Sequence, residues 1–227
     1  EILDNLKEIN AELIVKPTPD EDSSIKYVKD ADVILVDCNP VTEKVLNTAK
    51  KCKLVVQMGV GLDNIDIPAA TRRGIYVANV PDYCAKEVSD HTLALVLALK
   101  RKVNILDRKA RKGEWGLSEN ECIAALESQV FGVVGFGNIG RLVAQKAQIF
   151  GFNIVATDPF VSAEEAGKVG VRLLEFDRLL EISDVISLHV PLVKSTYHLF
   201  SEETIGKMKN TAYLVNTSRG GLVDEKA

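Results

Sequence analysis

The sequence predicts an α/β fold with two doubly wound parallel-sheet domains. Short β-branched apolar runs alternate with segments of helical spacing along the 227 residues, an order typical of parallel sheets joined by helices. The apolar runs between residues 12 and 80 are continuous, as expected for strands that are covered on both faces. A glycine-rich turn joins one such run to a helix in the second half of the chain. We therefore expect a first domain over residues 1–97 and a second over residues 98–227.

The first domain is predicted to begin with an amphipathic helix. Charges are spread through its sequence, EILDNLKEIN, which therefore does not have the apolar centre of a signal peptide. Four apolar runs, bounded by polar or turn residues, then predict strands at residues 12–15, 32–37, 53–58 and 75–80. Residues 41–51 and 67–74 have helical spacing and are expected to connect these strands.

A long helix is predicted from Lys86 to Lys112, at the passage between the two domains. Its start is rich in Ser, Asp and Glu, and its end is rich in Lys and Arg, which suits the helix dipole. A polar, irregular segment follows and contains Trp115, the only tryptophan. We expect Trp115 to be a local packing anchor, with a role in an interface as the alternative.

The second domain is predicted to contain a further series of strands and helices. Its strands are expected at residues 130–137, 153–158, 171–174, 184–190 and 211–218. Its helical patterns lie at residues 138–150, 176–182 and 202–208.

Composition and charge exclude several classes of protein. The net charge is −4, from 28 basic and 32 acidic residues, so the chain does not have the excess of basic residues that nucleic acid or an anionic membrane would require. The longest apolar run, Leu93–Leu99, is far shorter than the roughly 18–20 residues that cross a bilayer. The four cysteines are scattered and form no CxxC pair or metal-ligand pattern. We expect no metal site and a reducing, cytoplasmic location.

The glycine-rich turn has the GxGxxG spacing of a dinucleotide site, with Gly135, Gly137 and Gly140 in the sequence GFGNIG. It follows an apolar run and opens a helix. The first glycine allows a tight turn, the second lets a pyrophosphate approach the backbone, and the third lets helix and strand pack closely. The N-terminus of the helix then offers N–H groups and a positive dipole to the phosphates.

Asp158, at the end of the next predicted strand, is expected to accept a hydrogen bond from the ribose 2′-hydroxyl. It lies 158 − 135 = 23 residues after the first glycine, against about 20 in the motif. A carboxylate there repels a 2′-phosphate, so NAD(H) is favoured over NADP(H). Pro159 and Phe160 follow, and this immediate sequence offers no arginine that would reverse the preference.

Together these motifs resemble the D-isomer-specific 2-hydroxyacid dehydrogenase family over almost the whole chain. The matching segments are MGVGLDNIDIPAATRRGI (58–75), GVVGFGNIGRLVA (132–144), LHVPLVKSTYHLF (188–200) and NTSRGGLVDEKA (216–227). Residues 80–102 look closest to the branch of C-terminal-binding proteins and D-3-phosphoglycerate dehydrogenases.

The resemblance implies a flavodoxin-like substrate-binding domain over residues 1–97 and a Rossmann-like NAD-binding domain over residues 98–227, with a 2-hydroxy or 2-oxo acid in the cleft between them. Arg219 matches the catalytic substrate arginine of the family. Its planar fork suits two-point binding of a carboxylate and polarisation of the adjacent 2-oxo group. Val60 and Gly61 are expected to offer backbone N–H groups to the same carboxylate.

The resemblance also implies further cofactor contacts. Asn138 and Ile139 are expected at the pyrophosphate, although many relatives have arginine at the position of Asn138. The residues expected to line the adenine or ribose side are His189, Val190 and Pro191, and those expected near the nicotinamide are Thr217 and Ser218.

The proton acid/base of the reaction is not assigned. The family places a Glu and a His beyond the arginine, and this sequence ends eight residues after Arg219. We therefore expect the second domain to be truncated at its C-terminal end and to lack a final strand or two. His91 is more simply a structural residue, His189 matches a cofactor-lining position, and His198 is expected to be exposed.

Two functions are compatible with these motifs. The favoured one is an NAD-dependent oxidoreductase, acting on a D-2-hydroxyacid or 2-oxoacid as a homodimer. The alternative is an NAD(H)-sensing interaction protein of the C-terminal-binding, corepressor-like type.

Overall fold

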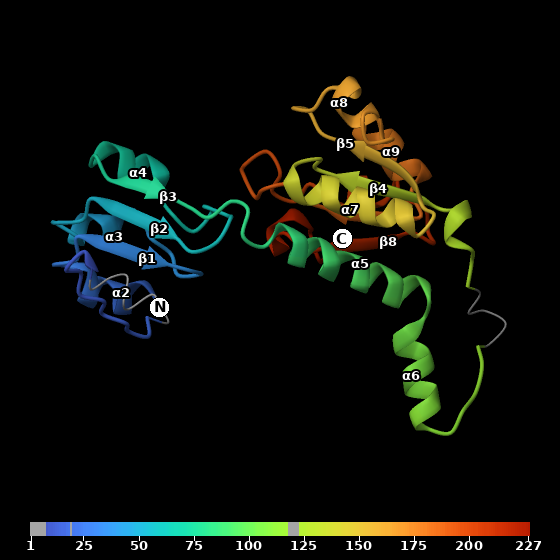
Figure 1. The fold of residues 1–227 in the computed structure, drawn as a ribbon, viewed down its shortest axis with the longest axis horizontal. Helices are drawn as coiled ribbons and strands as arrows, with labels where there is room; N and C mark the ends of the chain where they lie inside the picture. Colours follow the sequence, from blue (N-terminus) through green and yellow to red (C-terminus); the bar gives the residue numbers. More distant parts are fainter. Residues whose placement is uncertain (1–7, 19, 118–122) are drawn as a thin grey trace. The chain divides into compact units, whose positions relative to one another are not determined.

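The computed structural model describes residues 8–18, 20–117 and 123–227, and the chain divides into two compact units (Figure 1). Unit 1 is Glu1–Tyr83 and unit 2 is Cys84–Ala227. The boundary between these units differs from the one expected after residue 97. The reason is that helix α5 (Ala85–Lys100) contacts helix α7 (Asn138–Ile149) and strand β8 (Tyr213–Asn216) and so belongs with unit 2 along its whole length.

Unit 1 contains a three-stranded parallel sheet in the order β1-β2-β3. Its elements are α2 (Glu21–Val28), β1 (Val33–Val36), α3 (Glu43–Thr48), β2 (Leu54–Gln57), α4 (Ile67–Arg72) and β3 (Tyr76–Ala78). Each helix begins after a residue whose side chain accepts a hydrogen bond from a first-turn N–H. These capping residues are Asp20, Thr42 and Asp66.

The sheet of unit 1 is buried on one face only. Val36 and Val55 lie in a core cluster with Val45 and Leu46 of α3 and with the alanines of α4. Side chains of the opposite face, such as Val33 and Leu35 in β1, are exposed. The prediction that both faces are covered is therefore wrong for the described part of this unit.

The strand expected at residues 12–15 is also not formed. The segment has no regular structure, and Ile14 and Val15 are 64% and 79% exposed. β-Branched residues favour strands through packing and pairing with neighbours, and this segment has neither. Most of the amphipathic helix expected at the start, residues 1–7, lies outside the described residues.

Unit 2 contains a five-stranded parallel sheet in the order β6-β5-β4-β7-β8. The strands are β4 (Val130–Val134), β5 (Asn153–Thr157), β6 (Arg172–Leu173), β7 (Val185–Leu188) and β8. Besides α5 and α7, its α-helices in the described residues are α6 (Val103–Arg111), α8 (Ala163–Gly167), α9 (Phe176–Ile182) and α10 (Glu202–Ile205). The predicted five-strand series is thus confirmed, with shorter strands.

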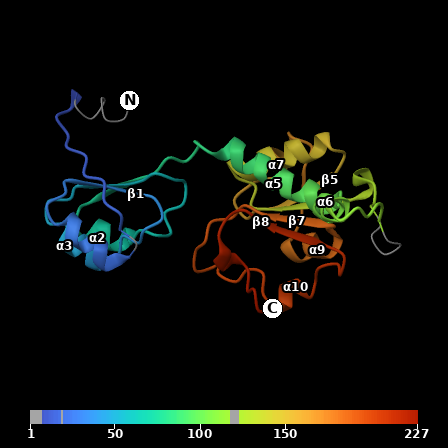
Figure 2. The ribbon, with the colours of Figure 1, turned by 90° about the horizontal axis from the view of Figure 1, so that it is seen from below.

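Both faces of this second sheet are covered. Figure 2 shows α5 and α7 on one side and α9 and α10 on the other. One core cluster joins Phe131 and Val133 to the buried faces of α5 and α7. A second joins Val134 and Ile186 to Leu179 and Leu180 of α9. Alternate residues of each strand therefore enter different cores.

The long helix predicted from Lys86 to Lys112 is two helices, α5 and α6. The break falls at Lys102, whose φ of 58° is left-handed and cannot continue a right-handed helix. The Lys102 ammonium donates a hydrogen bond to the Tyr213 hydroxyl at 2.5 Å, which ties the bend to β8.

Trp115 is 97% exposed, so its expected role as a packing anchor is wrong. Within the described residues, no helix is both long enough and apolar enough to cross a membrane.

Candidate functional site

The glycine turn after β4 has steric constraints that match the roles expected for its three glycines. Gly135 has a φ of 93°, and a Cβ there would lie 2.8 Å from the carbonyl carbon of His189. A Cβ on Gly140 would lie 2.1 Å from the carbonyl oxygen of Gly135. A Cβ on Gly137 would meet nothing within 4 Å. The turn is therefore closely packed beneath, at residues 135 and 140, and open above Gly137.

Helix α7 begins at this turn and directs its N-terminus over the open space. Gly137 is the N-cap and, as a glycine, provides no side-chain cap. A helix start in this form presents backbone N–H groups and a positive dipole, which together favour an anion such as phosphate. Asn138 is the first helical residue, and Ile139 packs against the core cluster between α7 and the sheet. The Ile139 side chain therefore has a packing role.

Asp158 follows β5 and is attached to the glycine turn. One carboxylate oxygen accepts a hydrogen bond from the Phe136 backbone N–H at 2.7 Å, and the other accepts from the Phe160 N–H at 2.9 Å. Each carboxylate oxygen has two lone pairs and retains capacity for a further donor. The half-buried Asp158 therefore fixes the turn and leaves a negative charge beside it.

An arginine also lies beside the turn, which corrects the inference drawn from the residues following Asp158. Arg141 of α7 donates from Nε to the Phe136 carbonyl at 3.0 Å, and its guanidinium lies 5.1 Å from the centre of the Phe136 ring. Sequence reasoning considered only the residues next to Asp158. Arg141 reaches the same turn from the first helical turns of α7, 17 residues earlier in the sequence (158 − 141 = 17).

His189 lies under the glycine turn. Its backbone N–H donates to the Val134 carbonyl at 2.7 Å, and its ring Nε2 is 2.9 Å from the hydroxyl of the buried Ser187. Desolvation lowers the pKa of His189 to about 4, so the ring is neutral near pH 7. Val190 contacts the position that a Gly135 Cβ would occupy, and Pro191 is exposed beyond it. The backbone of this segment thus supports the turn.

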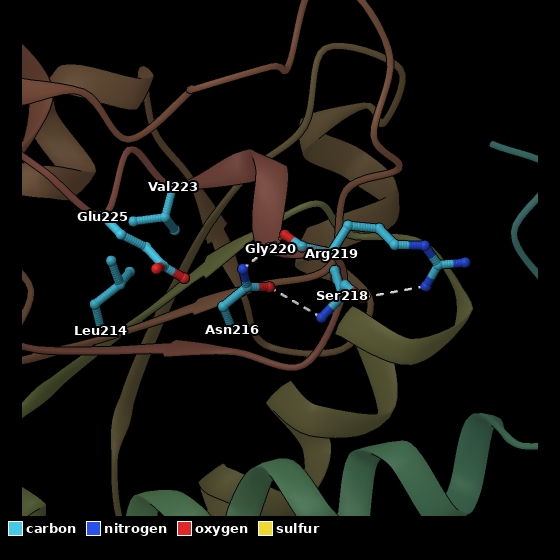
Figure 3. A pocket seen from close by; sticks show the side chains of 7 residues that line it. All are labelled: Leu214, Asn216, Ser218, Arg219, Gly220, Val223 and Glu225. Carbon is cyan, nitrogen blue, oxygen red and sulfur yellow. Dashed lines mark hydrogen bonds between the residues drawn. The ribbon is translucent and has the colours of Figure 1, made fainter. Parts of the chain in front are cut away.

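The segment from Asn216 to Arg219 is held by side-chain hydrogen bonds (Figure 3). The Asn216 amide accepts from the Ser218 N–H at 3.0 Å and donates to the Arg219 carbonyl at 2.8 Å. The Ser218 hydroxyl donates to the Leu188 carbonyl at 2.8 Å. The hydroxyls of Thr217 and Thr92 lie 2.9 Å apart. These contacts attach the segment to both β7 and α5.

Arg219 extends from this fixed segment. Its guanidinium donates to the Ser218 carbonyl at 3.1 Å and points away from Glu225 and Leu214 (Figure 3). A cavity of about 340 Å³ adjoins the segment and is lined by Leu214, Asn216, Ser218, Arg219, Gly220, Val223 and Glu225.

Asn216 and Thr92 were not predicted from the sequence as site residues. Asn216 is the last residue of β8, and an asparagine at a strand end often forms such a side-chain turn, whereas no sequence signal pairs Thr92 with Thr217.

The strand order brings the predicted unit 2 residues to one edge of the sheet. Asp158, Gly135, His189 and Thr217 follow β5, β4, β7 and β8, which are consecutive neighbours in the parallel sheet. The carboxyl ends of parallel strands share an edge, and that is where ligands bind in open α/β sheets.

Val60 and Gly61 lie in unit 1, in the loop after β2. The Asn79 side chain donates to the Val60 carbonyl at 2.7 Å. Asn64 steadies the same loop, because its side chain donates to the carbonyls of Asp37 and Asn39 at 3.2 Å and 2.9 Å. The peptide that joins Val60 to Gly61 is therefore oriented by Asn79, with its N–H directed opposite to the bonded carbonyl.

The remaining histidines lie elsewhere. His91 is exposed on α5. His198 is only partly exposed, stacks on the Tyr197 ring at 4.0 Å between ring centres, and has Nδ1 3.8 Å from an Asp224 carboxylate oxygen. Among the residues described, no group of His, Cys, Asp and Glu side chains has the arrangement of a metal site.

A family model described as the NAD binding domain of D-isomer specific 2-hydroxyacid dehydrogenases matches residues 93–227. The chain is 39% identical to a glyoxylate reductase of Korarchaeum cryptofilum, over 92% of this chain and 64% of that protein. It is also 39% identical to a D-3-phosphoglycerate dehydrogenase of Archaeoglobus fulgidus, over 100% of this chain and 43% of the relative. The chain therefore spans 43–64% of the length of these two curated relatives.

Two solved structures resemble the fold closely. A D-lactate dehydrogenase from Aquifex aeolicus, complexed with NAD and lactic acid, has a TM-score of 0.84 and 34% identity, covering 88% of this chain and 60% of that one. An acyclic imino acid reductase, Bsp5, in complex with NADPH and D-Arg, has a TM-score of 0.90 and 26% identity, covering 99% of this chain and 72% of that one.

The neutral His189 predicts a pH-dependent stability. Its folded pKa of about 4 lies below the ordinary value of 6.5, so the unfolded chain binds the proton first as pH falls. The free energy of unfolding should therefore decrease between about pH 6.5 and pH 4, with His189 contributing a loss of roughly 1–2 kcal/mol from pH 7.5 to pH 5. Urea denaturation of the wild type and of His189→Gln at these two pH values checks this. Equal losses in both proteins would contradict it.

Proposed function

Because the chain belongs to the D-isomer-specific 2-hydroxyacid dehydrogenase family, we propose that it is part of an NAD-dependent oxidoreductase acting on a D-2-hydroxyacid or the matching 2-oxoacid. The observation that carries the proposal is the shared sheet edge. There the glycine turn, with the carboxylate of Asp158, and the segment ending in Arg219 follow strands of one parallel sheet. The glycine turn and Asp158 suit a dinucleotide, and Arg219 suits a carboxylate.

The turn fits a dinucleotide by steric and chemical criteria. The open space at Gly137 and the helix N-terminus that begins after this glycine suit a pyrophosphate. In the proposal, Gly135, Gly137, Gly140, Asn138 and Ile139 form this cradle through their backbone. The Asp158 carboxylate accepts from the ribose diol. Bound NAD(H) would supply the hydride acceptor or donor.

Five further positions of unit 2 are proposed to surround the cofactor. The His189–Pro191 segment lies toward the adenosine side, and Thr217 and Ser218 lie toward the nicotinamide. The bonds of Ser218 to Leu188 and of Thr217 to Thr92 support this role, because they hold the segment still before a ligand arrives. His189 is neutral near pH 7 and engaged with Ser187, so it is not assigned proton transfer.

Arg219 is proposed to bind the substrate carboxylate and polarise the 2-oxo group as hydride is transferred. Its backbone is fixed by Asn216, which limits the positions its guanidinium can reach. Val60 and Gly61 are proposed to contribute backbone N–H groups to the same carboxylate. The relatives are named for different acids, so the proposal extends only to the 2-hydroxyacid class.

The wider organisation is proposed as follows. Unit 1 is the substrate-binding domain and unit 2 the NAD-binding domain of a cytoplasmic homodimer. The exposed Trp115 and Ile149 of unit 2 support an interface there, since large apolar side chains at full exposure favour association. The relatives are named as oxidoreductases and do not favour an NAD(H)-sensing corepressor-like protein.

Gly137→Ala tests the cradle. The new methyl group meets nothing within 4 Å, so the free energy of unfolding should fall by at most about 1 kcal/mol, the cost of alanine at an N-cap. NADH affinity should fall by a factor of about 10 or more, because the methyl occupies the space of the pyrophosphate. Calorimetry and urea denaturation measure the two effects.

Gly140→Ala is the matched control for this substitution. Its methyl would collide with the Gly135 carbonyl, so it should lower the free energy of unfolding more than Gly137→Ala does. Unchanged NADH affinity in Gly137→Ala would contradict the proposed cradle.

Asp158→Ala tests the ribose contact. The loss of a charged hydrogen-bond acceptor should weaken NADH binding by roughly 1.5–3 kcal/mol and weaken NADPH binding far less. Asp158→Asn keeps the shape and one acceptor for the Phe136 N–H, and it separates loss of charge from loosening of the turn. If calorimetry gives the same NADH/NADPH ratio for Asp158→Ala and the wild type, the ribose contact is misplaced.

Arg219→Lys tests the substrate contact and the activity together. A panel of 2-oxoacids with NADH, assayed with the full-length protein, should give turnover on at least one acid. Lysine keeps the charge but loses the planar fork, so kcat/KM should fall by a factor of roughly 100 or more. The Kd for NADH should not change. Equal kcat/KM in the variant would mean that another cation binds the acid.

A further inference from the structure

Arg141 is a cation beside the proposed ribose position that neither the resemblance nor the proposed function uses. It donates only through Nε, to the Phe136 carbonyl. Within the residues that the structure describes, its other four N–H groups have no hydrogen-bond partner, and no carboxylate oxygen lies within 4 Å of the guanidinium. An arginine is rarely half-buried with so few partners unless something else meets it.

Asp158 and Arg141 act on the same residue from two elements. The carboxylate accepts from the Phe136 N–H at 2.7 Å, and the guanidinium donates to the Phe136 carbonyl at 3.0 Å. The two charged groups are therefore held on either side of a single fully buried residue. A ligand group that lies beside this part of the turn meets both a negative and a positive charge.

The Arg141 guanidinium interacts electrostatically with the helix that follows β5. Among the influences that lower the pKa of Glu165 in α8, Arg141 acts after the two hydrogen bonds from Ser162. Asp158 belongs to this same connection between β5 and α8. Arg141 and Asp158 therefore meet at Phe136, beside the connection where the adenosine ribose is expected.

We propose that Arg141 is a second determinant of cofactor specificity, a latent partner for the 2′-phosphate of NADP(H) that Asp158 overrides. A 2′-hydroxyl binds the carboxylate and needs no cation. A 2′-phosphate is repelled by the carboxylate and attracted by the guanidinium, which matches phosphate with its planar fork. In the wild type the carboxylate excludes the phosphate. When Asp158 is replaced by an uncharged residue, Arg141 can bind the 2′-phosphate. This inference depends on the proposed function, because it assumes that a dinucleotide occupies the turn.

The test is a double-mutant cycle with two ligands. Calorimetry measures the Kd of NADH and of NADPH for the wild type, Asp158→Ala, Arg141→Gln and the double variant, at fixed ionic strength. Glutamine retains an N–H donor for the Phe136 carbonyl, so it removes the charge and leaves a local hydrogen bond possible. Asp158→Ala should bind NADPH at least about 10-fold more tightly than the double variant does. For NADH the two should agree within about twofold.

A control for net charge is Lys112→Gln, an exposed residue just after α6, combined with Asp158→Ala. This control should bind NADPH as Asp158→Ala does. The gain that depends on Arg141 should also shrink at higher salt, because it is a contact between charges.

Two results would overturn the inference while NADH still binds the wild type. One is equal NADPH affinity in Asp158→Ala and the double variant. The other is a loss of affinity on Arg141→Gln that is the same for NADH and NADPH. Arg141 would then only support the turn. If the wild type binds neither nucleotide, the proposed function fails, and the inference fails with it.

Discussion

The close contact between Gly140 and the carbonyl of Gly135 is the constraint on which the site depends. No side chain fits between them, so α7 can begin directly over the end of β4. That placement brings the start of the helix to the turn, next to the backbone of Phe136. Asp158 and Arg141 then bind the N–H and the carbonyl of Phe136. The backbone of His189 supports the turn from below. A small steric requirement thus fixes both an anion site and the charges that flank it.

The arginine segment depends on a different kind of restraint. After β8 the chain is held by side chains, with Asn216 closing the turn and Ser218 and Thr217 attached to Leu188 and Thr92. Because β8 lies next to β7, and β7 next to β4, the segment shares its edge with the glycine turn. In a parallel sheet, strand order alone brings such distant residues together. A site assembled in this way on regular elements has its reacting groups positioned before a ligand binds.

Much of unit 2 could be predicted from the sequence, because its signals are local. Apolar runs marked its five strands, and the glycine spacing marked the turn with Asp158 at the end of the next strand. The failures came from interactions between distant residues. Residues 12–15 have the composition of a strand but pair with nothing in the described chain. The long predicted helix breaks at Lys102, which is tied to Tyr213. Arg141 and Thr92 acquire their roles only when the chain folds, so no local pattern identified them, whereas the turn at Asn216 has a local signal.

The central claim is that a dinucleotide lies across the turn between β4 and α7, with its reactive ring near the segment that ends in Arg219. An NMR titration of backbone amides with NADH tests this most directly. The account predicts saturable shifts at the amides of Gly137, Asn138 and Gly140, and at those of Ser218 and Arg219, with a single Kd for both groups. Shifts confined to other residues, or a turn whose amides do not respond to NADH, would contradict it.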